Sequence, residues 1–117
     1  MPLSKLTQAF IAFRDERNWA QFHTLRNLIV SLNLEAGELL ELTQWKDDAA
    51  ISVALGDVGF QEALRDECAD ILLYLLLIAD RAGIDLEQAA FAKLRKNAAK
   101  YPVDKSYGSS RKYTDLV

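Results

Sequence analysis

Apolar side chains recur at helical spacing along most of the chain. Leu6, Phe10 and Phe13 follow Ser4, a residue type that often caps the start of a helix, so a first helix is predicted there. Residues 18–23 break this spacing and are predicted to form a connection. No segment shows a convincing two-residue period of a strand, and the pattern therefore predicts an all-α fold.

A second helix is predicted from about Leu25 to Lys46. Its apolar face consists of Leu25, Leu28, Leu32, Ala36 and Leu39. Residues 47–60 carry turn residues and predict an inter-helix loop, with room for a short turn of helix.

A third helix is predicted from about Phe60 to Arg81, with Gly83 as its stop. Its residues 71–79 are apolar all round, which favours the centre of a bundle or a subunit contact. A buried strand is the alternative for this run, but its helical flanks argue against it.

A fourth helix is predicted to start at Asp85, with Gln88 as its capping-box partner, and to end before Pro102. Residues 103–117 are predicted to form a loop-like tail. Four helices in 117 residues fit a single domain with a bundle-like core.

Two acidic pairs lie on the two most apolar helices, Glu35-x-x-Glu38 and Glu67-x-x-Asp70. Residues three apart on a helix are neighbours, so each pair presents two carboxylates to one place. Such pairs are often solvated surface features, but these lie on or beside apolar stripes. Because buried unpaired carboxylates are costly, the pattern predicts a bound cation.

The ligand types narrow the choice of cation. Oxygen ligands without sulfur or nitrogen partners suit a hard cation such as Mg²⁺. A di-iron carboxylate bundle would need Glu-x-x-His motifs, and the only histidine, His23, lies outside both pairs. Mg²⁺ held by carboxylates typically binds phosphate oxygens, and a spare carboxylate, here Glu38, can act as general base.

Basic residues concentrate near the end of the chain, where residues 93–113 carry seven Lys or Arg and one acid. A solvated surface accounts for several of them, and a clamp on the outer phosphates of a nucleotide is the functional interpretation. Lys93, Asn97 and Lys100 share one helix face and are the candidates for this clamp.

Aromatic residues gather near the ends of the helices that carry the acids. They could be core residues, or they could form a stacking pocket for a base, with the histidine supplying a hydrogen bond. The candidates are Trp19, Phe22, His23, Trp45 and Tyr74.

Composition excludes several classes of function. The net charge of −3 makes the chain a poor general binder of nucleic acid, and a single cysteine, Cys68, excludes a disulfide framework. The N-terminal residues do not resemble a signal peptide, and the nine-residue apolar run is shorter than the roughly 20 residues a bilayer span needs. We therefore expect a soluble cytoplasmic protein without a membrane segment.

These motifs together resemble one known family. Trp19-x-x-Phe22-His23, Gln44-Trp45-Lys46 and the two acidic pairs are similar to the MazG-like all-α NTP pyrophosphohydrolases, and most similar to their dCTP pyrophosphatase branch. The resemblance implies Mg²⁺-dependent hydrolysis of a deoxynucleoside triphosphate between its α and β phosphates, as nucleotide-pool house-cleaning. It also implies a homodimer or homotetramer with sites at subunit contacts.

The resemblance also implies roles for individual residues. Glu35, Glu38, Glu67 and Asp70 would bind the metal. The nucleotide would contact Trp19, Ala20, Gln21, Phe22, His23, Trp45 and Tyr74. Phe10 stands where some relatives carry a histidine that reaches the substrate, so dCTP or a modified dCTP is expected but the base preference stays open. A non-catalytic nucleotide-binding helical module is the alternative function.

Overall fold

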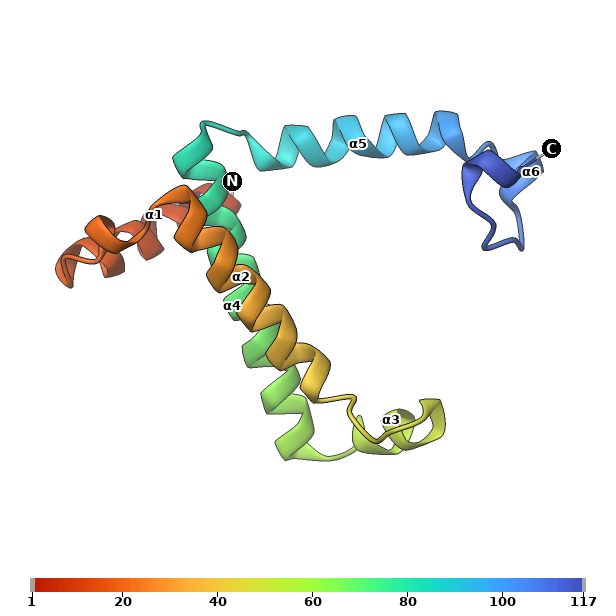
Figure 1. Cartoon of the computed structure of the whole chain (residues 1–117), viewed down its shortest axis with the longest axis horizontal. Helices are drawn as coiled ribbons and strands as arrows, with labels where there is room; N and C mark the ends of the chain where they lie inside the picture. The colour runs from red at the N-terminus through yellow and green to blue at the C-terminus, as the bar shows by residue number, and fades with distance from the viewer. Residues whose placement is uncertain (1, 117) are drawn as a thin grey trace. The chain divides into compact units, whose positions relative to one another are not determined.

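The computed structural model describes residues 2–116, whose only regular secondary structure is helical (Figure 1). The elements are α1 (Pro2–Glu16), η1 (Ala20–Phe22), α2 (Leu25–Glu41), α3 (Asp48–Ala54), α4 (Val58–Ala82), α5 (Leu86–Lys100), α6 (Val103–Ser106) and η2 (Tyr113–Asp115). The two η elements are single turns of 3-10 helix. The predicted all-α class and its four long helices are confirmed.

Contacts divide the chain into two compact units, unit 1 (Met1–Ile84) and unit 2 (Asp85–Val117). In unit 1, α2 and α4 pack side by side as an antiparallel pair, and α1 lies against α4 (Figure 1). In unit 2, the tail follows α5 and ends in η2. That one domain spans residues 1–117 stays a prediction.

Side-chain caps fix where the long helices begin. The carboxylates of Asp57 and Asp85 accept hydrogen bonds from the amides three residues later, and the Thr24 hydroxyl does the same at the start of α2. At the other end of α4, Gly83 adopts a left-handed backbone with φ of 70°, which is the predicted stop.

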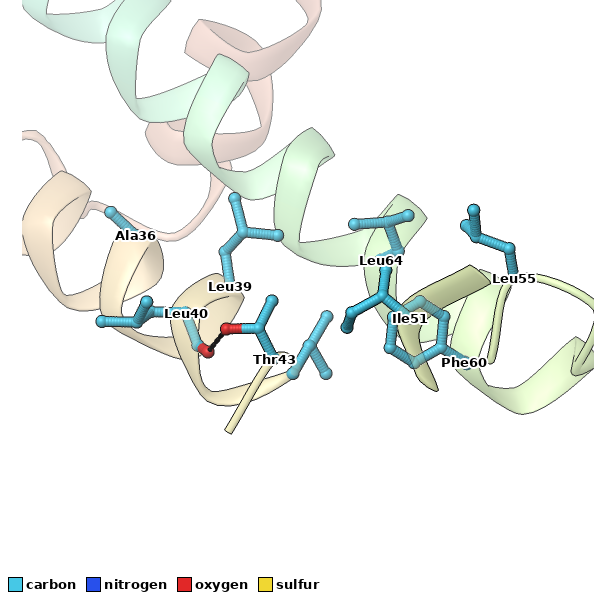
Figure 2. A pocket seen from close by; sticks show the side chains of 9 residues that line it. Ala36, Leu39, Leu40, Thr43, Ile51, Leu55, Phe60 and Leu64 are labelled. Carbon is cyan, nitrogen blue, oxygen red and sulfur yellow. Dashed lines mark hydrogen bonds between the residues drawn. The ribbon is translucent and has the colours of Figure 1, made fainter. Parts of the chain in front are cut away.

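The predicted end of the second helix at Lys46 was wrong, because α2 ends at Glu41. The next three amides, from Leu42 to Gln44, each bond to a carbonyl three residues back, which tightens the chain into turns. The Thr43 hydroxyl also donates to the Leu40 carbonyl oxygen at 2.7 Å (Figure 2). This local bond competes with continuation of the α-helix.

Two segments predicted as loops contain helices. Residues 48–54 form α3, which Asp47 caps by accepting a hydrogen bond from the Ala50 amide. In the tail, Pro102 precedes α6, where its fixed φ suits a helix start. Both helices are too short for their apolar period to be visible in the sequence.

The core of unit 1 is small. Among residues 2–116, the buried hydrophobic side chains are Leu28, Leu76, Leu77 and Ala79. The predicted apolar face of α2 is therefore only partly right, since Leu28 is buried but Leu25 is 41% exposed. Within the same residues, no helix combines the length and hydropathy that crossing a membrane requires.

Much apolar surface remains uncovered in this single chain. On α2, Leu34 and Leu40 are 65% and 70% exposed. An open apolar hollow of about 330 Å³ lies between α2, α3 and α4 (Figure 2). Its lining includes Leu39, Leu40, Ile51, Leu55, Phe60 and Leu64. Apolar surface of this extent is typical of an interaction site.

We predict that Leu77→Ala lowers the free energy of unfolding by about 2–5 kcal/mol, because it leaves a cavity in the core. Leu77 is 1% exposed, whereas Leu72 on the same helix is 36% exposed and provides the matched control. Urea denaturation of both variants measures the difference. Equal losses for Leu72→Ala and Leu77→Ala would contradict the core described above.

Candidate metal centre

Three carboxylates meet where α2 packs on α4. Glu35 and Glu38 lie one turn apart on α2, and Glu67 comes from α4. One oxygen from each of the three lies within 4.8 Å of the others. The antiparallel packing of the two helices therefore brings three of the four predicted acids to one place.

Burial and crowding make this carboxylate group costly to ionise. One oxygen each of Glu35 and Glu67, Oε2, is buried without a hydrogen-bond partner. Desolvation first, and then the neighbouring carboxyls, raise the pKa of Glu35 from 4.5 to about 7. Desolvation also raises the pKa of Glu67, with further contributions from Glu38 and Asp70.

The donor set fits a hard divalent cation. Two oxygens that each bind Mg²⁺ at about 2.1 Å lie at most about 4.2 Å apart, so small side-chain rotations would suffice to form the site. A cation would also supply the buried Glu35 and Glu67 oxygens with the partner they lack. The exposed Glu38 lies at the solvent side of the group.

Asp70, the fourth predicted ligand, lies one turn beyond Glu67 on α4 but outside the three-carboxylate group. Its shorter side chain reaches less far than that of a glutamate. Its charge nevertheless contributes to the raised pKa values of Glu35 and Glu67, so it lies close to them. Its place among the metal ligands stays a prediction.

The predicted aromatic connection follows α1 through a sharp turn. Asn18 has a left-handed backbone with φ of 55°, a conformation that asparagine tolerates better than most residues. Its carbonyl oxygen accepts a hydrogen bond from the Gln21 side chain at 3.0 Å. Ala20 and Phe22 bound the η1 turn, and Phe22 is 60% exposed.

The side chains of His23 and Trp19 lie close together in this connection. Their ring centroids are 6.4 Å apart. Desolvation first, and then the charge of Arg14, lower the pKa of His23 below 6.5, so the imidazole is neutral near pH 7. Its Nδ1 atom is buried without a hydrogen-bond partner.

Tyr74 links the aromatic residues to the acids. Its ring meets the ring of Phe10 edge-on, with centroids 6.5 Å apart. Desolvation first, and then the charge of Glu35, raise the pKa of the Tyr74 hydroxyl. The Tyr74 side chain therefore lies beside the carboxylates of Glu35 and Asp70.

Phe10, Trp19, His23 and Tyr74 form an aromatic cluster. Phe13 and Arg17 also belong to this aromatic cluster, and the sequence did not predict them. The Phe13 ring meets that of Trp19 edge-on at 5.7 Å, and the Arg17 guanidinium lies 3.6 Å from the Phe13 centroid. The same guanidinium is 5.9 Å from the Trp19 ring. The spacing of Phe10 and Phe13 on one face of α1 was the available signal.

Trp45 lies after α2, not at its end as predicted. It is 93% exposed, and its backbone is left-handed with φ of 65°. A bulky residue in this backbone conformation is strained. Because the Trp45 ring is exposed, packing against the protein does not offset this strain. A strained, exposed side chain such as that of Trp45 is typical of a residue that binds a ligand or a partner.

The three candidates for the phosphate clamp lie on α5 in unit 2. Lys93 and Lys100 are exposed and Asn97 is half-buried. The Lys100 ammonium lies 4.7 Å from the centroid of the Tyr113 ring, so it already has a partner within the unit. Their role in substrate binding stays a prediction.

We predict that the metal-free protein loses stability as pH rises through about 7. A carboxyl whose pKa is raised on folding contributes stability that is complete below about pH 4.5 and is lost as the pH passes its folded value. Urea denaturation in EDTA between pH 5 and 8.5 measures this dependence.

Two variants test whether the dependence comes from Glu35. Glu35→Gln should flatten the pH profile, because it removes the crowded carboxyl. Glu41→Gln, an exposed position on α2 outside the carboxylate group, should retain the profile. Identical slopes in both variants would contradict the assignment.

We also predict that Trp45→Gly raises the free energy of unfolding by about 0.5–1 kcal/mol. Relief of the left-handed strain, worth about 1–2 kcal/mol, exceeds the entropic cost of glycine, about 0.5–1 kcal/mol. The same variant should bind a nucleoside triphosphate more weakly. A stability loss above about 1 kcal/mol would indicate instead that the ring is packed.

Comparison with known proteins shows which family the chain belongs to. Residues 30–116 match the model of the MazG-like family. The chain is 42% identical to rat (Rattus norvegicus) dCTP pyrophosphatase 1 over 97% of its own length and 67% of the rat protein, and 40% identical to the human (Homo sapiens) protein over the same shares. A solved pyrophosphatase structure from Archaeoglobus fulgidus aligns with a TM-score of 0.81 at 36% identity, covering 87% of this chain and 94% of that one. The chain therefore belongs to the MazG-like family.

Proposed function

We propose that this protein is a Mg²⁺-dependent pyrophosphohydrolase of deoxynucleoside triphosphates that releases the monophosphate and pyrophosphate. The main support for this proposal is the group of Glu35, Glu38 and Glu67 on the packed helices α2 and α4. One carboxylate oxygen from each lies within 4.8 Å of the others. Relatives named dCTP pyrophosphatase 1, at 40–43% identity, support dCTP or a modified dCTP as the substrate.

The acids would bind the phosphate end of the substrate through the cation. Glu35, Glu38, Glu67 and Asp70 would hold Mg²⁺, which when bound neutralises charge that develops on the phosphate oxygens. Glu38 is exposed at the edge of the group and would accept the proton of the attacking water. The water oxygen bonds to the α phosphorus, the bond from that phosphorus to the bridging oxygen breaks, and pyrophosphate leaves with the electron pair.

The aromatic cluster would bind the base. Trp19 is 41% exposed and would stack on the base. Trp45 lies beyond the opposite end of α2, so it would stack on the base bound by a second copy of the chain. The neutral His23 lies beside Trp19 and would accept a hydrogen bond from the exocyclic amino group of a cytosine. Tyr74 lies next to the acids and would set the distance between base and phosphates.

A second copy of the chain is part of this proposal. The exposed Leu34 and Leu40 and the apolar hollow of Figure 2 leave more apolar surface in water than a stable monomer normally shows. A homodimer or homotetramer would cover them, and the enzyme would act in the cytoplasm. In sedimentation velocity, a species near 13.2 kDa as the main component would contradict this assembly.

We predict pyrophosphate release from dCTP in the presence of Mg²⁺, faster than from dATP, dGTP or dTTP. Glu38→Gln and Asp70→Asn should each lower kcat at least about 100-fold without unfolding the protein, because each removes a charge from the site. Release of pyrophosphate in a coupled assay measures turnover, and circular dichroism checks folding.

Glu41→Gln provides the matched control, because it removes an acid from the same helix outside the carboxylate group. It should retain nearly full activity. Mg²⁺-dependent binding of nucleotides without any product would favour the non-catalytic module instead. Undiminished turnover in both Glu38→Gln and Asp70→Asn would overturn the site assignment.

A further inference from the structure

The tail of unit 2 contains a hollow that the proposed chemistry does not use. It has a volume of about 650 Å³ and is open to solvent. Its lining includes Asp104, Lys105, Gly108, Ser109, Ser110 and Arg111, and we call it the loop hollow. Its polar lining contrasts with the apolar lining of the hollow in unit 1.

The tail that forms the loop hollow is fastened to the end of α5. The rings of Tyr101 and Tyr113 meet edge-on with centroids 6.0 Å apart. The Lys100 ammonium lies 4.7 Å from the Tyr113 centroid on the same ring. These contacts join the two ends of the segment, so the loop is held in a defined shape before any ligand arrives.

Hydrogen bonds inside the loop support this shape. The Ser109 amide donates to the Ser106 carbonyl oxygen at 3.0 Å, and the Arg111 amide donates to the Ser109 hydroxyl oxygen at 3.2 Å. Gly108 has a φ of 72°, which allows the chain to reverse between them. Lys105 and Arg111, on opposite sides of this reversal in the sequence, therefore line one hollow.

The charge of unit 2 favours an anionic ligand. Residues 85–117 carry seven basic and four acidic residues, whereas residues 1–84 carry seven basic and thirteen acidic ones. Two cations and two hydroxyls line the loop hollow, with a single carboxylate, Asp104, opposing an anion. Arginine pairs well with phosphate because its planar group can bind two oxygens at once.

We propose that the loop hollow binds a phosphate group of a multiply charged ligand, either inorganic pyrophosphate or the outer phosphates of a nucleotide. Arg111 and Lys105 supply the charge, and the hydroxyls of Ser109 and Ser110 donate hydrogen bonds to the phosphate oxygens. The binding itself does not depend on the proposed hydrolysis. Only its assignment to a nucleotide substrate rests on that function.

The experiment is a titration of the full chain with pyrophosphate in EDTA, followed by calorimetry and by backbone amide chemical shifts. Shifts centred on Ser109, Ser110 and Arg111 are expected. A parallel titration with dCTP distinguishes the two sources, because the tighter ligand identifies whether product or nucleotide is the occupant. Absence of shifts in the loop with both ligands would overturn the proposal.

Three variants separate a specific site from general attraction. Arg111→Gln should weaken pyrophosphate binding at least about tenfold. Arg95→Gln removes an exposed arginine of α5 that does not line the loop hollow, and should leave binding nearly unchanged. Asp104→Asn should strengthen binding, because it removes the opposing carboxylate. Equal weakening by both arginine variants would show only diffuse attraction and overturn the proposal.

The two proposals fail separately. Because the titration contains EDTA and no Mg²⁺, it does not depend on the carboxylate group or on turnover. A protein that binds pyrophosphate in the loop but releases none from dCTP would retain this site and lose the proposed function. A protein that hydrolyses dCTP without loop shifts would do the reverse.

Discussion

The packing of α2 on α4 places carboxylates of like charge close to one another. Packing of α2 on α4 buries Leu28 and Leu77, and the same packing brings Glu35, Glu38 and Glu67 within 4.8 Å of one another. The apolar contact therefore stabilises a carboxylate group that would separate in water. The pKa of Glu35, raised to about 7, reflects this crowding, which either a proton or a cation would relieve. A bound cation would therefore stabilise the helix pair.

Charge is divided unevenly between the two units. Unit 1 carries seven basic and thirteen acidic residues, and unit 2 carries seven basic and four acidic ones. The proposed substrate needs, besides a partner for its cation, an apolar surface for the base. The aromatic cluster around Trp19 and Tyr74 supplies that surface within unit 1. The small core, by contrast, leaves the apolar hollow for a further chain to cover.

The sequence predicted those features that follow from local period and capping. The cap Asp85, the stop at Gly83, and the meeting of Glu35 and Glu38 with Glu67 all follow from spacing along a helix. The end of α2 could not be predicted, because the apolar spacing continues past Glu41 while the Thr43 bond to Leu40 turns the chain. Burial of the α2 face was overestimated at Leu25, since periodicity identifies an apolar side but not what covers it. The Phe13, Arg17 and Trp19 contacts and the loop hollow depend on tertiary geometry that no short pattern encodes.

The crowded carboxylates are proposed to bind a cation. Calorimetric titration of the protein with Mg²⁺ at pH 6.5, repeated in two buffers of different ionisation enthalpy, tests this binding. We expect Mg²⁺ binding coupled to proton release, because Mg²⁺ must displace the proton that a pKa of about 7 leaves on Glu35. Proton release should disappear in Glu35→Gln. Absence of Mg²⁺ binding, or binding with the same proton release in that variant, would contradict a cation site at these carboxylates.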